Sequence, residues 1–239
     1  MNAIPEAATP EARTRHVPDV RNVRDLGGLE TGRGPIRSGL LLRGAALHEL
    51  TAEGADVLAD LGLRTVIDLR MKVERDAAPN LVRRHARLAG VRELHMPLVR
   101  DFEDCPDSPD GSYLFMTERG APVIGAVLAT LAEPGALPAL VHCSAGKDRT
   151  GIVVGALLRT LDVPLAQIHA DYLRSNETLG DRLIYPAATS KLDASLAYMA
   201  GSDGGVEGFL ERNGVTRETL AGLHADLLGR DPALSPSGR

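Results

Sequence analysis

Cys143 and Arg149 lie six residues apart in the segment Val-His-Cys-Ser-Ala-Gly-Lys-Asp-Arg-Thr-Gly, residues 141–151, and together they could do phosphate chemistry. A thiolate at Cys143 would be a nucleophile, and the planar guanidinium of Arg149 can hold two phosphate oxygens at once. Asp148 offers a carboxyl group that can protonate a departing oxygen, and Thr150 adds a hydroxyl within reach of the sulfur. These residue types favour hydrolysis of a phosphate ester through a cysteinyl-phosphate.

A tight loop between two apolar runs would position these side chains. Residues 139–141 follow Gly135 and Pro138 and predict a short buried strand, and residues 152–158 are apolar enough for a buried helix. The backbone N–H groups of the loop and the positive end of the helix would converge on a dianionic phosphate. We expect His142 to orient the loop by hydrogen bonding. The residues predicted to bind the phosphate are Ser144, Ala145, Gly146, Lys147 and Thr150.

Three other interpretations of the loop fit less well. Gly146-Lys147 does not form a Walker motif, because Asp148 stands where a magnesium-binding hydroxyl would be. The seven histidines show no metal-ligand spacing, so the sequence predicts no zinc site. A rhodanese-like sulfur carrier also uses a loop headed by cysteine, but it would not need Asp148 or the Arg-Thr ending.

His142-Cys143-x5-Arg149-Thr150 resembles the signature of the cysteine-based protein tyrosine phosphatases. The fuller Cys-x-x-Gly-Lys-Asp-Arg-Thr-Gly is similar to the bacterial tyrosine and dual-specificity branch, which includes the mycobacterial tyrosine phosphatase B and related lipid-active phosphatases. Residues 22–28, 66–70 and 171–176 also look like that branch, so the resemblance covers roughly residues 19–180. It implies that residues 22–28 brace the phosphate site, and that neither a metal nor another cofactor is needed.

The general acid is the role in which this sequence departs from the pattern of the other tyrosine phosphatases. The chain has no Trp, so it lacks the Trp-Pro-Asp loop that supplies the acid in other tyrosine phosphatases. Asp148 is the favoured acid. The alternatives are Asp68, at the end of a predicted strand, where it would otherwise support the site through a salt bridge, and an acidic loop with Asp101, Asp104 and Asp107.

The substrate remains open between two classes. Phosphotyrosine in proteins is the first expectation, and inositol phospholipids are the alternative, because Lys147 adds charge beside the phosphate and a Lys at this position occurs in lipid-active relatives. A phospho-ligand binding module with weak catalysis is the second alternative, although the presence of Cys143, Asp148, Arg149 and Thr150 disfavours it.

Composition sets wider limits. The 239 residues predict a flexible arm over 1–18, a single domain over 19–230 and a disordered tail over 231–239. The net charge of −5 argues against nucleic-acid binding, and two cysteines cannot form a disulfide framework. Residues 1–18 carry no Sec signal and no apolar run reaches a membrane span, so a cytoplasmic location is the default, with export by another route as in some relatives. The oligomeric state is left open.

The remaining elements alternate between strands and helices. Strands are expected over 39–43, 64–69 and 92–98, and helices after Thr51 and over 81–88, 113–131, 164–178, 206–213 and 216–228. Residues 22–28 read as a turn, and residues 180–200 as a helix broken at Pro186 that could form a lid over the pocket. The pattern predicts an α/β fold with a mostly parallel sheet of four or five strands flanked by helices, which is the phosphatase fold that the resemblance implies.

Overall fold

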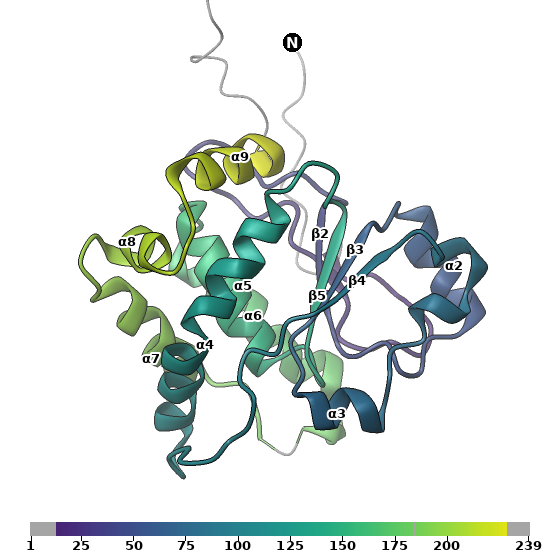
Figure 1. Ribbon diagram of the computed structural model, residues 1–239, viewed down its shortest axis with the longest axis horizontal. Coiled ribbons are helices and arrows are strands. Elements are labelled where there is room, and N and C mark those ends of the chain that lie inside the picture. The colour runs from purple at the N-terminus through teal and green to yellow at the C-terminus, as the bar shows by residue number, and fades with distance from the viewer. Residues whose placement is uncertain (1–12, 184, 229–239) are drawn as a thin grey trace, which may run out of the picture.

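A five-stranded sheet forms the centre of the molecule, in the order β1-β2-β5-β3-β4 (Figure 1). The computed structural model describes residues 13–183 and 185–228. The strands are β1 (Arg24–Asp25), β2 (Leu41–Gly44), β3 (Thr65–Asp68), β4 (Arg92–His95) and β5 (Ala139–His142). All neighbouring strands are parallel except β1 and β2, which are antiparallel. The predicted mostly parallel α/β sheet is therefore confirmed.

Helices cover both faces of this sheet (Figure 1). On one side lie α4, α5, α6, α7, α8 and α9, and on the other lie α2 and two short 3₁₀ turns. The helices are α2 (Ala52–Asp60), α3 (Lys72–Ala77), α4 (Pro109–Leu131), α5 (Asp148–Thr160), α6 (Leu165–Leu179), α7 (Thr189–Ala200), α8 (Gly205–Arg212) and α9 (Arg217–Leu228), with 3₁₀ turns at Val82–Arg84, Ala86–Leu88 and Gly180–Arg182.

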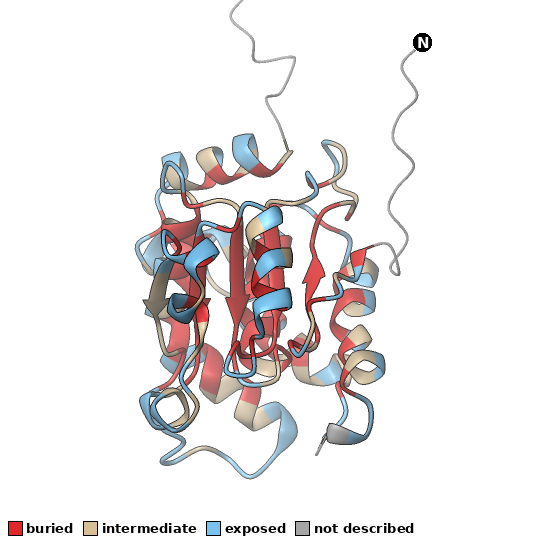
Figure 2. Ribbon diagram, turned by 90° about the vertical axis from the view of Figure 1, so that its right-hand side faces the viewer, coloured by how far each residue is buried: buried red, intermediate tan, exposed pale blue. Residues whose placement is uncertain are grey.

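The central strands are buried on both faces, whereas β4 at the edge is partly exposed (Figure 2). Successive side chains alternate between two apolar clusters, because a strand points its residues to opposite faces with a period of two. In β5, Val141 joins the large cluster under α4 and α5, and Leu140 joins the smaller one under α2. This two-sided burial explains why the parallel strands are apolar runs.

The strand register assembles the carboxyl edge of the sheet. Gly44 pairs with His142, His142 with Asp68, and Asp68 with His95, so the last residues of four strands form one row. In an open α/β sheet, ligands bind outside this edge. The loop that follows β5 starts from the middle of the row.

Several predicted elements differ from the structure. Residues 22–28 were expected to be only a turn, but they contain β1, and the helix expected over 81–88 is two 3₁₀ turns. The sequence does not predict the short helix α3, because none of its side chains is buried and it therefore shows no apolar periodicity.

The prediction of a lid over residues 180–200 is wrong for its helical part, which belongs to the core. Helix α7 begins only at Thr189, and its Leu192, Leu196 and Met199 are buried in the core against α4 and α5. The preceding segment, with Leu183 and Tyr185, lines a cavity beside the loop after β5.

The two ends of the chain lie largely outside the described residues. This applies to residues 1–12 of the expected arm and to the whole of the expected tail over 231–239. The last part of the expected arm is packed, since Arg13 and Val17 are both buried.

Helix α4 is long and apolar enough to cross a membrane by length and composition alone, a match found within residues 13–183 and 185–228. Of the most apolar 18-residue stretch of this helix, 56% is buried inside the protein. It packs against α5 and α7, which is typical of the central helix of a globular core.

A buried charge cluster ties α6 to the start of the domain. The Asp171 carboxylate contacts Arg13 at 3.1 Å, Arg24 of β1 at 2.9 Å and Arg43 of β2 at 2.7 Å. Burial alone would raise the pKa of Asp171, but the three guanidinium charges outweigh that effect and hold it well below its usual range. Asp171 therefore stays ionised and neutralises arginines from three distant segments.

We expect Asp171→Asn to lower the free energy of unfolding by about 3–5 kcal/mol, because it leaves buried guanidinium groups without their counter-charge. Denaturant unfolding followed by circular dichroism measures this loss. Asp193→Asn is the matched control, since the Asp193 carboxylate pairs with His169 near the surface and its loss should cost about 1 kcal/mol or less. Equal losses in the two variants would contradict the role given to the cluster.

Candidate active site

The loop between β5 and α5 is held by its carbonyl oxygens. Each carbonyl from Cys143 to Lys147 accepts a hydrogen bond from a group behind the loop, with donor–acceptor distances of 2.7–3.1 Å. The donors, in order along the loop, are His142 Nδ1, the Ala46 N–H, Asn22 Nδ2, Arg43 Nη2 and the Gly151 N–H.

This arrangement turns the loop N–H groups toward one another. In a trans peptide the C=O of one residue and the N–H of the next point in opposite directions. Because the carbonyls of residues 143–147 point outward, the N–H groups of residues 144–148 point into the curve of the loop, at the N-terminus of α5. Such a cradle binds anions. The predicted phosphate-binding roles of Ser144, Ala145, Gly146 and Lys147 remain predictions, with a backbone geometry that suits them.

Gly146 is the residue that allows the loop to curve so tightly. Its φ is +67°, and a Cβ there would lie 2.2 Å from the Gly44 carbonyl oxygen of β2. Only glycine fits both the left-handed backbone and the close approach to the neighbouring strand.

Arg149 is held at the mouth of the loop by Glu74 of α3. Both Nη atoms donate to the two oxygens of Glu74, with 2.8 Å for Nη2 to Oε1, and Nη2 also lies 3.2 Å from Ser144 Oγ. Ser144 in turn donates to Glu74 at 2.6 Å. Burial would raise the pKa of Glu74, but the hydrogen bonds from Arg149 and Ser144 lower it to about 2. The carboxylate is thus ionised and fixes the guanidinium plane.

The neutral imidazole of His142 is hydrogen-bonded both to Asn80 and to the first carbonyl of the loop. The Asn80 amide donates to Nε2 at 3.0 Å, so Nδ1 carries the proton and donates to the Cys143 carbonyl at 3.1 Å. Complete burial lowers the pKa of His142 to about 4, despite the Asp68 carboxylate 3.9 Å away. The orienting role of His142 stays a prediction, and these two hydrogen bonds suit it.

Asp68 is occupied by structural contacts. Arg70 donates to it from its backbone N–H and its guanidinium, with 2.7 Å for Nη2 to Oδ2, and Asn80 adds a contact at 3.3 Å. Burial would raise its pKa, but the hydrogen bond from Arg70 and the nearby His142 lower it. These contacts suit the supporting role predicted for Asp68 better than a proton donor.

Asp148 begins α5 and is partly exposed. Its Oδ1 lies 3.5 Å from Lys147 Nζ and accepts a hydrogen bond from the Tyr113 hydroxyl of α4. The Lys147 ammonium also donates to the Tyr185 carbonyl. Thr150 is completely buried, and its hydroxyl has no recorded hydrogen-bond partner among the described residues, so the expected contact with the cysteine sulfur is not formed here.

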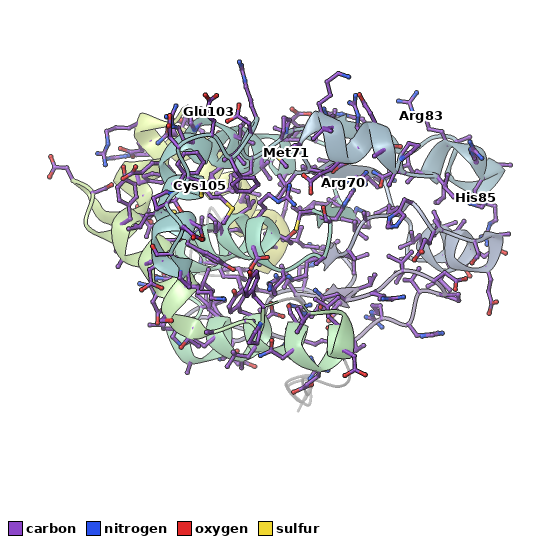
Figure 3. The ribbon with its side chains drawn as sticks, turned by 90° about the horizontal axis from the view of Figure 1, so that it is seen from below. Arg70, Met71, Arg83, His85, Glu103 and Cys105 are labelled. Carbon is purple, nitrogen blue, oxygen red and sulfur yellow. The ribbon has the colours of Figure 1, made fainter. Side chains whose placement is uncertain are left out.

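The acidic loop before α4 lines a cavity other than the one beside the loop between β5 and α5. Asp101 and Asp104 line this second cavity with Phe115 and Arg119. Within the described part of the chain, no hydrogen bond or ion pair joins this loop to residues 143–149. Seen from below, Glu103 and Cys105 of this loop lie on one side of Arg70 and Met71, and the basic residues Arg83 and His85 lie on the other (Figure 3). Neither Cys105 in this loop nor Cys143 forms a disulfide bond.

A cavity of about 380 Å³ opens beside the loop. Ser144, Lys147 and Asp148 form one wall, and the residues that complete it are Asp19, Arg21, Ala45, Ala46, His48, Glu49, Ala145, Leu179, Leu183 and Tyr185. Over residues 13–183 and 185–228, no group of three or more His, Cys, Asp or Glu side chains is placed to hold a metal ion.

Some site residues were missed by the sequence analysis. Glu74 lies close to Arg149 in space but 75 positions away in the chain, and Asn80 lies close to His142 but 62 positions away. The one available signal was the charge of Glu74 shortly after a strand end. Asn22 was expected to brace the site through the resemblance, and its amide does contact the Ala145 carbonyl.

A family model and two related proteins of similar sequence all point to the same family. The model of the tyrosine phosphatase family matches residues 15–229. A tyrosine-protein phosphatase of Nostoc commune is 29% identical over 80% of this chain and 75% of its own length. The triple specificity protein phosphatase PtpB of Mycobacterium tuberculosis is 32% identical over 69% of this chain and 70% of its own.

Among solved structures, the catalytic core of Siw14 shares the fold. It has a TM-score of 0.51 and 16% identity, and the match covers 84% of this chain and 96% of that one. At this identity the likeness concerns the arrangement of sheet and helices alone.

The pKa of His142 predicts a pH dependence of stability. The unfolded histidine takes up a proton near pH 6.5, whereas the folded one does so only near pH 4, so stability is lost as the pH falls below 6.5. Between pH 6.5 and 4.5 we expect the free energy of unfolding to fall by about 2–3 kcal/mol. Below pH 4.5 the depressed carboxyl of Glu74 adds to the loss, which is why the window ends there.

Denaturant unfolding at a series of pH values tests this. The variant His142→Asn has no group that titrates at that position, so its stability should stay nearly flat over the same window. A variant that follows the wild-type slope would show that other groups cause the loss.

The Glu74–Arg149 pair predicts an effect on phosphate affinity. Glu74→Gln removes a charge-assisted hydrogen bond that orients the guanidinium, so binding of inorganic phosphate should weaken roughly tenfold. Calorimetric titration measures it, with Asp76→Asn on the exposed side of the same helix as control. Tighter binding in Glu74→Gln would mean that Glu74 competes with phosphate for Arg149.

Proposed function

This chain belongs to the tyrosine phosphatase family, and on that premise we propose that it hydrolyses phosphate monoesters through a cysteinyl-phosphate intermediate. Cys143 is the nucleophile, Arg149 and the loop N–H groups hold the phosphoryl oxygens, and Asp148 is the general acid and base. The observation that carries the proposal is the loop itself, whose five outward carbonyls leave an anion cradle between Cys143 and Arg149.

In the first step the Cys143 thiolate attacks phosphorus in line with the leaving oxygen. The S–P bond forms as the P–O bond breaks, and Asp148 gives its proton to the departing oxygen. The negative charge on the three equatorial oxygens is stabilised by the loop N–H groups and by Arg149.

In the second step water attacks the cysteinyl-phosphate. The Asp148 carboxylate takes a proton from the water, the S–P bond breaks, and inorganic phosphate leaves with Cys143 restored as thiolate. One carboxyl group thus serves both steps, and the enzyme returns to its starting state.

Phosphotyrosine in proteins is the proposed substrate class. Two curated relatives are named as tyrosine-protein or triple specificity protein phosphatases, which supports a protein substrate. Inositol phospholipids are the second candidate, because the Lys147 ammonium lines the cavity beside the loop and would add positive charge next to a second anionic group.

The binding-module alternative predicts that the chain recognises a phosphate without turning it over. It is disfavoured by the complete set of Cys143, Asp148, Arg149 and Thr150. Recognition alone would require the cradle and Arg149 but not an acid beside them.

The first experiment measures phosphate release in EDTA from a phosphotyrosine peptide, a phosphoserine peptide and phosphatidylinositol monophosphates. We expect release from the phosphotyrosine peptide, abolished in Cys143→Ser and reduced about 10²–10⁴-fold in Asp148→Asn. A preference for the lipids would select the second candidate.

Three outcomes would contradict parts of the proposal. Turnover retained in Cys143→Ser would remove the nucleophile assignment, and turnover retained in Asp148→Asn would move the acid elsewhere. No release by folded, reduced protein from any of these substrates, with phosphate still bound, would favour the binding module.

A further inference from the structure

Two buried tyrosines form a hydrogen-bonded chain that ends on Asp148. The Tyr113 hydroxyl of α4 donates to Asp148 Oδ1, and the Tyr172 hydroxyl of α6 lies 2.5 Å from the Tyr113 oxygen. A phenol has one proton to give. Because Tyr113 gives its proton to the carboxylate, Tyr172 is the donor to Tyr113, and the chain runs from Tyr172 through Tyr113 to Asp148.

Both hydroxyls keep their protons near neutral pH. Burial raises the pKa of Tyr113, and the adjacent Asp148 charge raises it further. Burial also raises the pKa of Tyr172, to about 12, although the hydrogen bond with Tyr113 acts in the opposite direction. Each tyrosine is therefore a permanent donor, and neither takes part in proton exchange with the substrate.

The contacts of Asp148 converge on one of its two oxygens. Tyr113 donates to Oδ1, and the Lys147 ammonium lies 3.5 Å from the same atom. Among the described residues no hydrogen bond to Oδ2 is recorded, and the side chain of Asp148 is 38% exposed beside the cavity. An oxygen that faces two donors is a poor place for a proton, so the proton of the carboxyl group belongs on Oδ2.

We propose that Tyr113, supported by Tyr172, is a positioning residue that holds Asp148 Oδ1 as an acceptor and so presents the acidic proton on Oδ2 to the leaving group. This inference rests on the proposed function. In the first step the Oδ2–H bond breaks and its proton passes to the ester oxygen as the P–O bond breaks, while both tyrosines keep their own protons.

A glycine at the start of α5 makes room for this chain. A Cβ on Gly151 would lie 3.1 Å from Cδ2 and Cε2 of the Tyr172 ring, closer than ordinary packing. The absence of a side chain at Gly151 lets the ring lie against the first turn of α5, one turn from Asp148. Tyr172 also follows Asp171 directly, so the buried charge cluster fixes its place on α6.

The test uses aryl phosphates whose leaving groups differ in their need for a proton. Phenol is a poor leaving group as the phenolate, whereas 2,4-dinitrophenolate leaves without protonation. The kinetic constant to compare is kcat/KM, which includes the step in which the P–O bond breaks. We expect Tyr113→Phe to lower kcat/KM for phenyl phosphate about tenfold and that for 2,4-dinitrophenyl phosphate by less than about twofold.

Two further variants complete the series. The quantity compared is the ratio of kcat/KM for phenyl phosphate to kcat/KM for 2,4-dinitrophenyl phosphate. Tyr172→Phe keeps the donor to Asp148 and removes only its support, so it should lower this ratio by about threefold. Tyr198→Phe makes the same chemical change on the far side of α7, where its ring contacts Phe209, and should leave the ratio unchanged. The ratio does not depend on how much of a preparation is folded.

The outcomes separate this inference from the proposed function. Equal losses for both substrates in Tyr113→Phe, or no loss, would overturn the positioning role while the phosphatase assignment stands. If Tyr113→Phe does not fold, an unchanged ratio in Tyr172→Phe overturns the role. A wild-type protein that releases no phosphate from either ester would contradict the proposed function itself.

Discussion

The structure depends on the outward orientation of the loop carbonyls over residues 143–147. A backbone can bind an anion only if its N–H groups converge, and each peptide that turns an N–H inward must turn a carbonyl outward. A buried carbonyl needs a donor. Arg43 and Asn22 supply two of these donors, and both are held by the Asp171 cluster, since Arg24 joins Asp171 to the Asn22 side chain. The interior charge cluster is thus part of the scaffold of the site.

A second scaffold supports the loop from the other side of the sheet. Asn80 links the neutral His142 to Asp68 and Arg70, and its Oδ1 accepts from the Leu47 N–H and from Arg70, so its amide has one orientation. Each polar group in this network has a partner, which is the condition under which buried polar groups specify a single arrangement. The loop is therefore held from both sides before any ligand arrives.

The sequence predicts the parts of the site that are continuous in the chain. The strand, loop and helix around Cys143 follow from two apolar runs with polar residues between them, and the helix after Thr51 follows from its N-cap, which the structure contains. Glu74 and Asn80 could not be found this way. Helix α3 buries none of its residues, so it leaves no periodic pattern, and the contacts of both residues arise only when β3 and β5 pair.

The role of Tyr113 could not be predicted from the sequence for a related reason. Its hydrogen-bond partners come from α5 and α6, and no residue near it in the chain indicates these contacts. Its place has a chemical consequence for Asp148, the carboxyl group that in the proposed mechanism is the acid in one step and the base in the next. Such a group passes through both protonation states, so a neighbour that only donates is compatible with both, provided that it contacts the oxygen without the proton. The Lys147 ammonium can only donate, and Tyr113 already accepts from Tyr172, so its own proton is committed to Oδ1. Oδ2 is left to give up and take back a proton without any rearrangement around it.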